Sequence, residues 1–79
     1  MEQLEELVLF MARNLVDDPD SVKVESRQRG RIVTVTLTVP SEDMGKVIGR
    51  QGRIARSMRT LLTIASSREG YRASLDING

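Results

Sequence analysis

The stretch Gly45-Lys46-Val47-Ile48-Gly49-Arg50-Gln51-Gly52-Arg53-Ile54 decides how this chain folds. Two glycines three residues apart separate two short segments with helical apolar spacing. Glycine lacks a Cβ, so an anion can approach its backbone closely, and the first turn of a helix offers N–H groups without partners. Lys46, Arg50 and Arg53 place positive charges around the glycines. The stretch therefore predicts an anion-binding turn between two helices.

Two better-known phosphate loops do not fit this stretch. A Walker A loop has the pattern G-x-x-x-x-G-K-[ST] after a strand, and the sequence lacks it. A dinucleotide fingerprint has G-x-G-x-x-G at the end of a strand, whereas Gly45 and Gly49 are spaced wrongly and follow a predicted helix. A bare G-x-x-G also occurs in ordinary tight turns between helices, so its meaning depends on the surrounding elements.

The residues before the loop predict a helix over 2–16 and two strands over 22–28 and 31–39. The helix is indicated by one apolar stripe, formed by Leu4, Leu7, Val8, Met11 and Leu15. Pro19 stops it, because proline cannot continue a helix. In the second strand, apolar residues at 33, 35, 37 and 39 alternate with threonines, which is typical of a half-buried strand. The short turn at Gly30 makes the two strands antiparallel.

The residues after position 40 predict a short helix to about residue 48, a long helix over 53–66 and a third strand over 71–77. The apolar stripe of the long helix consists of Ile54, Ala55, Met58, Leu61, Leu62 and Ala65. The order is α-β-β-α-α-β, so we expect an α+β, two-layer domain spanning 1–79, with three helices on one face of a three-stranded mixed sheet. A two-helix crossover places the third strand parallel to the second.

The net charge is only +1, but the charges are distributed unevenly. Residues 44–68 contain six basic residues and no acidic one, which leaves six basic and eleven acidic residues for the rest of the chain. A charge of +6 in one segment and −5 elsewhere argues against a general polyanion binder and favours a local anionic contact. A solvated helix face is the alternative that charge alone leaves open.

The composition excludes most catalytic chemistry. The chain has no histidine and no cysteine, which removes the usual general base, the commonest metal ligands and any disulfide framework. Asp17, Asp18 and Asp20 surround Pro19 and fit a helix stop better than a cation site. We therefore expect no enzymatic activity, no metal and no cofactor. The sequence has no segment apolar enough to span a membrane, and we expect a soluble, cytoplasmic protein.

The pattern Val-Ile-Gly-x-x-Gly-x-x-Ile at 47–54, with these elements around it, closely resembles the KH family of RNA-binding domains. In that family the G-x-x-G loop clamps four nucleotides by their backbone, and the element order here is that of the type II form. Over nearly the whole chain, including the ending Ser-Arg-Glu-Gly-Tyr-Arg-Ala-Ser-Leu-Asp-Ile at 67–77, the sequence is similar to the small bacterial KhpA proteins.

The resemblance implies a protein that binds single-stranded RNA and acts as an RNA chaperone or post-transcriptional regulator. Its partners would be RNA and either a second copy of itself or a larger KhpB-type KH protein. The implied RNA-binding residues are Lys46, Ile48, Gly49, Arg50, Gln51, Gly52, Arg53 and Arg56. The loop residues hold the backbone, Lys46 and Arg53 touch phosphates, and Ile48 lines an apolar floor for bases. Arg56 and Arg59 either extend the basic track or are simply solvated.

One apolar residue of the long helix does not fit the buried stripe. At 100° per residue Ile64 lies off that stripe, beside Ser57 and Thr60. A lone exposed isoleucine is common on protein surfaces. A flat surface of Ser57, Thr60 and Ile64 would also suit a two-fold contact between helices, so we predict a dimer or partner contact there. The alternative to RNA binding is a protein-interaction scaffold whose loop is idle.

Overall fold

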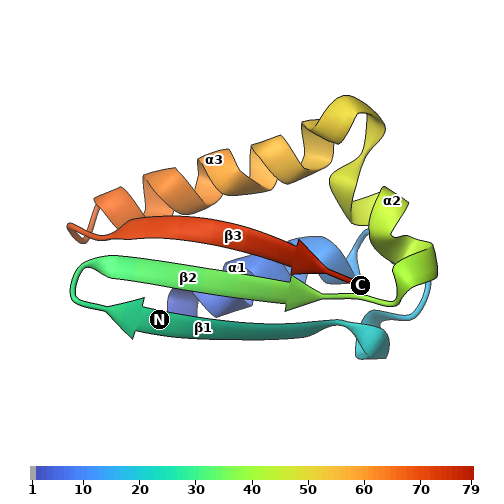
Figure 1. The fold of residues 1–79 in the computed structure, drawn as a ribbon, viewed down its shortest axis with the longest axis horizontal. Helices are drawn as coiled ribbons and strands as arrows, with labels where there is room; N and C mark the ends of the chain where they lie inside the picture. Colours follow the sequence, from blue (N-terminus) through green and yellow to red (C-terminus); the bar gives the residue numbers. More distant parts are fainter. Residues whose placement is uncertain (1) are drawn as a thin grey trace.

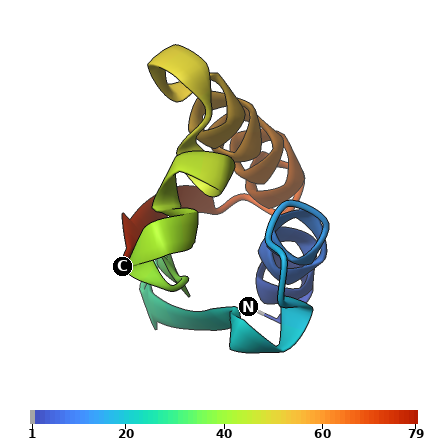
Figure 2. The ribbon, with the colours of Figure 1, turned by 90° about the vertical axis from the view of Figure 1, so that its right-hand side faces the viewer.

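A computed structural model describes residues 2–79 of the chain as three strands and a set of helices. The elements are α1 (Glu2–Arg13), η1 (Pro19–Ser21), β1 (Lys23–Arg29), β2 (Ile32–Thr38), η2 (Ser41–Asp43), α2 (Met44–Ile48), η3 (Arg50–Gly52), α3 (Arg53–Ser67) and β3 (Arg72–Asn78). In Figure 1, α1 lies behind the sheet and α3 runs along the side of β3. Figure 2 shows α1 and α3 on the same side of the sheet. The expected two-layer α+β architecture is confirmed.

The sheet is mixed, as the sequence predicted. The strand order is β1-β2-β3, with β1 and β2 antiparallel and β2 and β3 parallel. Gly30 has a φ of 61° in the tight turn between β1 and β2, a conformation that glycine adopts without strain. The parallel pair arises because α2 and α3 carry the chain back along the helical face before β3 begins.

The core lies between the sheet and the helices. Val33, Val35 and Leu37 of β2 are fully buried, and the intervening threonines lie on the other face. From the helices, Leu4, Val8 and Ala12 of α1 and Met58 and Leu62 of α3 complete the cluster. The apolar face of the central strand, where every second residue is buried, therefore packs against the apolar stripes of two helices. This is the packing that the sequence predicted.

Two details of the predicted helices are wrong. The α-helix α1 ends at Arg13 rather than at residue 16, because the Asn14 side chain donates to Phe10 O at 2.7 Å and the chain then turns. Leu61 is 45 % exposed, although it was placed in the buried stripe of α3. Ser66 is buried instead, and its hydroxyl donates to Thr63 O. The buried side of α3 is therefore rotated toward β3, which leaves Leu61 at the solvent boundary.

The sheet face opposite the helices is polar and exposed. The cross-strand register places Glu25, Thr36 and Asp76 side by side on this face, with Thr34 and Ser74 in the neighbouring row. This face is the one turned toward the reader in Figure 1. Across residues 2–79, no helix has the length and apolarity needed to cross a membrane.

Candidate nucleic-acid interface

The loop between α2 and α3 is built from backbone conformations that few residues adopt. Gly49 has φ 78° and ψ 173°, and Gly52 has φ 74° and ψ 16°. Gln51, between them, is in the left-handed region at φ 56°. The loop is held by bonds from Gly49 N–H to Gly45 O at 2.9 Å and from Gly52 N–H to Gly49 O at 3.1 Å. A non-glycine residue in the left-handed region often marks a functional position.

Gly49 is required by packing as well as by conformation. A Cβ built on Gly49 would lie 2.6 Å from Ile54 Cγ1 and 2.9 Å from Ile54 Cδ1. Ile54 belongs to the first turn of α3 and packs against the core. Gly52 differs, because a Cβ at that position would meet nothing within 4 Å. The first glycine therefore lets α3 approach the loop, whereas the fold requires the second for its backbone conformation and not for packing.

Positive charge and an open helix end meet at the loop. The side chains of Arg50, Gln51 and Arg53 are exposed and line a shallow depression over the loop. Gly52 precedes α3 and supplies no side-chain cap, so the positive end of the helix dipole faces this depression. Within residues 2–79, no carboxylate lies within salt-bridge distance of Arg50 or Arg53. These features describe a site for an anion such as a phosphate.

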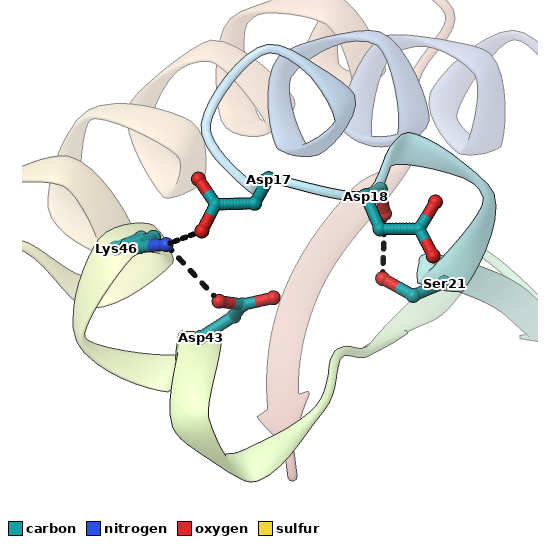
Figure 3. Close-up of polar contacts among 5 residues, drawn as sticks. All are labelled: Asp17, Asp18, Ser21, Asp43 and Lys46. Atoms are coloured by element: carbon teal, nitrogen blue, oxygen red, sulfur yellow. Dashed lines mark hydrogen bonds and ion pairs between the residues drawn. The ribbon is translucent and has the colours of Figure 1, made fainter.

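Lys46 has partners that the sequence did not reveal. Its Nζ lies 2.6 Å from Asp17 Oδ2 and 3.2 Å from Asp43 Oδ1 (Figure 3). The hydrogen bond to Asp17 and the weaker one to Asp43 raise the pKa of Lys46 above its ordinary value. Asp43 is buried, so the ammonium also compensates a carboxylate removed from water. Lys46, which was expected to touch a phosphate, joins the segment after α1 to α2.

The other predicted RNA contacts surround the loop on α2 and α3. Ile48 is half-buried and packs against the core at the end of α2. Arg56 is exposed one turn after Arg53. Arg59 turns the other way, because its Nη2 donates to Leu75 O of β3 at 3.3 Å. The structure thus brings the loop, Ile48, Arg53 and Arg56 together and engages Lys46 and Arg59 elsewhere.

The predicted dimer surface is part of a larger apolar face. Ser57, Thr60 and Ile64 are all exposed along α3, and Ile64 is 50 % exposed. Phe10 of α1, at 68 %, and Leu61 add further exposed apolar area. An apolar groove between the two helices is lined by Phe10, Met11, Asn14, Leu15, Arg53, Ile54, Ser57 and Met58. Sequence periodicity gave no sign of this groove, because it depends on how α1 crosses α3.

Comparison with known proteins agrees with the fold. A family model described as "KhpA/KhpB, KH domain" matches residues 5–77. The chain belongs to this KH-domain family. A protein named RNA-binding protein KhpA from Caldanaerobacter subterraneus is 46 % identical over 72 residues, which cover 91 % of this chain and 96 % of that protein. The matched residues span β1, β2 and α3 completely and all of β3 except its last residue.

Other members of the KhpA/KhpB family align over similar lengths. RNA-binding protein KhpA of Aquifex aeolicus is 42 % identical over 77 residues, or 98 % of each chain. RNA-binding protein KhpA of Listeria monocytogenes is 40 % identical over 74 residues, which cover 94 % of this chain and 97 % of that protein. These names describe a nucleic-acid binder and give no enzymatic activity.

Proposed function

We propose that this protein binds single-stranded RNA by holding its phosphate backbone on the Gly49–Gly52 loop. The observation that carries the proposal is the coincidence of three features at one place. The loop exposes glycine backbone, the uncapped end of α3 points its dipole at it, and Arg50 and Arg53 lie beside it without carboxylate partners in the described residues. The names of the relatives support RNA as the source of the phosphates.

The binding mode follows from what each group offers. Backbone phosphates sit against Gly49 and Gly52, where no Cβ blocks approach, and the guanidinium groups of Arg50 and Arg53 supply charge. Ile48, half-buried beside the loop, offers apolar surface to a base. With two or three phosphate contacts, the logarithm of affinity should fall with the logarithm of salt at a slope of about −1.4 to −2.1. Binding of this kind is weak and shows little base preference.

The cellular role that we propose is RNA chaperoning or post-transcriptional regulation in the bacterial cytoplasm. A single weak site becomes effective when a second site is held nearby, because the second contact is then intramolecular. A partner chain of the same family, either a second copy or a KhpB-type protein, would supply that second site. The description of the matching family, which covers both KhpA and KhpB, supports this pairing.

The test of RNA binding is the double variant Arg50→Asp with Gln51→Asp. Both side chains are exposed, so the fold should persist while acidic groups repel the phosphates. We expect RNA affinity, measured by fluorescence anisotropy, to fall at least tenfold. The matched control, Arg13→Asp with Gln3→Asp, makes the same charge change on exposed residues of α1. An equal effect of both pairs on affinity would refute the role of the loop.

We further propose that the apolar face shared by α1 and α3 is the contact between chains. Phe10, Leu61 and Ile64 are large, apolar and well exposed on this face, and Ser57 and Thr60 are small enough to let a second helix approach. Ile64→Asp places a charge at its centre and should shift sedimentation from dimer to monomer. Thr63→Asp, an exposed residue on a different side of α3, is the control. A dimer that persists in Ile64→Asp would rule out this face.

A further inference from the structure

The sheet face opposite the helices carries a second basic surface, at the far end of the molecule from the loop. The register pairs Arg29 with Ile32 on β2, and Ile32 with Arg72 on β3. In the next row Arg27 pairs with Thr34, and Thr34 with Ser74. Residues paired in this way share one face of a sheet, so Arg27, Arg29 and Arg72 project together. We call these three residues with Ile32 the sheet patch.

The arginines of the sheet patch form no ion pair within the described residues. All three are exposed, and within the described chain no carboxylate lies within salt-bridge distance of any of them. The nearest acidic residues on this face, Glu25 and Asp76, lie one row further along. Neighbouring strands are about 4.8 Å apart and alternate residues about 7 Å apart, so the backbone positions of the three arginines lie within about 12 Å of one another. Positive charges this close together repel one another, so an anionic partner bound between them would be favoured.

The sheet patch is also held rigidly. Arg31, in the turn beside it, donates from Nη1 to Gly70 O at 3.2 Å, and its guanidinium lies 5.8 Å from the Tyr71 ring centroid. Arg72 N–H donates to Arg31 O at 2.8 Å. The β1–β2 turn is thereby joined to the start of β3, which fixes the spacing of Arg29 and Arg72. A fixed backbone spacing of the two arginines leaves less backbone freedom to be lost on binding.

Two features of the patch fit RNA better than a small anion. Ile32 is 55 % exposed between Arg29 and Arg72, so apolar surface lies among the charges. The hydroxyl side chains of Thr34 and Ser74 lie in the adjacent row, and such groups commonly bond to phosphate and sugar oxygens. An extended chain that alternates charged phosphates with flat, partly apolar bases can contact all of these groups at once.

We propose that the sheet patch is a second contact for the backbone of the same single-stranded RNA, beyond the segment held by the loop. This inference rests on the proposed function of the loop. In Figure 1 the β1–β2 turn and the Gly49–Gly52 region lie at opposite ends of the molecule. Thr38 lies six positions beyond Ile32, at the other end of β2, which corresponds to about 20 Å of strand. Only an RNA longer than the roughly four nucleotides of the loop site reaches both.

The experiment compares an unstructured RNA of about four nucleotides with one of about 20 nucleotides. The patch variant is Arg27→Gln with Arg72→Gln, and its charge-matched control is Arg13→Gln with Arg68→Gln, all at exposed positions and the control pair outside the sheet. Losing two phosphate contacts should make the salt slope for the long RNA shallower by about 1.4, which corresponds to about 25-fold weaker binding at 0.1 M salt. Binding of the short RNA should stay within about twofold of wild type.

The outcomes separate this inference from the function of the loop. Arg27→Lys with Arg72→Lys should restore most of the affinity for the long RNA, which shows that charge rather than folding is responsible. If the patch variant binds the long RNA as the control does, the inference is wrong, and a simultaneous change in self-association would assign the surface to protein contact instead. If Arg50→Asp with Gln51→Asp leaves short-RNA binding unchanged, the proposed function of the loop fails independently.

Discussion

Gly49→Ala should destabilise the fold much more than Gly52→Ala, although each change adds one methyl group to the same loop. Gly49 occupies a region of φ and ψ that is almost restricted to glycine, and its new Cβ would lie 2.6 Å from Ile54 Cγ1. Gly52 is in the ordinary left-handed region, and a Cβ there meets no atom within 4 Å. The two sites therefore differ both in conformational strain and in steric conflict with Ile54.

The magnitudes can be worked from these geometries. For Gly52→Ala, the left-handed conformation alone costs about 1 to 2 kcal/mol. For Gly49→Ala, strain of about 1 to 3 kcal/mol adds to overpacking of about 1 to 3 kcal/mol, so about 4 kcal/mol is expected. A domain of 79 residues has a free energy of unfolding of about 4 to 12 kcal/mol, so Gly49→Ala should be near the limit of stability.

Urea denaturation followed by circular dichroism measures both costs. With a slope of about 1 to 2 kcal/mol per molar urea, the midpoint should fall by about 2 M or more for Gly49→Ala and by about 1 M for Gly52→Ala. The cause is tested with Ile54→Ala, which removes the two closest atoms. The double variant Gly49→Ala with Ile54→Ala should be at least about 1 kcal/mol more stable than the sum of the two single destabilisations predicts. In the double variant Gly52→Ala with Ile54→Ala, the two destabilisations should simply add.

Equal costs for the two glycines, or additive effects of Gly49→Ala and Ile54→Ala, would refute this reasoning. Equal costs would mean that the loop can shift to avoid the conflict between the new Cβ at position 49 and Ile54. Additive effects would mean that the cost at Gly49 arises from conformation alone.

Two further predictions concern charge and packing. Asp17→Asn should release Lys46 from its shorter ion pair and raise RNA affinity by up to about fivefold at 0.1 M salt, as expected for one added phosphate contact. The control is Asp20→Asn, which lies in the same segment of the chain. An equal gain in affinity in both variants would assign the effect to net charge. Ser66→Leu should lower the free energy of unfolding by about 1 to 3 kcal/mol, because Ser66 is buried and neighbouring atoms leave no space for a larger side chain. Ser66→Ala should change the free energy of unfolding by less than about 1 kcal/mol. Thermal denaturation distinguishes these results.

The sequence was sufficient for features set by local backbone geometry. Alternation through residues 33–37 has only one arrangement in a half-buried strand, and the apolar stripe of residues 4–11 has only one in a helix. The glycine pair between two helical segments predicted the turn that the structure contains. Leu61 and Ser66 mark the limit of this reasoning, because both lie at the edge of a stripe where the neighbouring element decides which is covered.

The contacts that give the surface its chemistry depend on the tertiary structure. Lys46 and Asp17 are 29 residues apart, so no local pattern pairs them. Arg29 and Arg72 are brought beside Ile32 only by the register of two different strand pairs. The loop of Gly49, Arg50, Gln51 and Gly52 could be read directly, since glycine spacing and charge are properties of neighbours in the chain. The partners of Lys46, the groove beside Phe10 and the sheet patch required the fold, because separation in sequence says nothing about which faces meet.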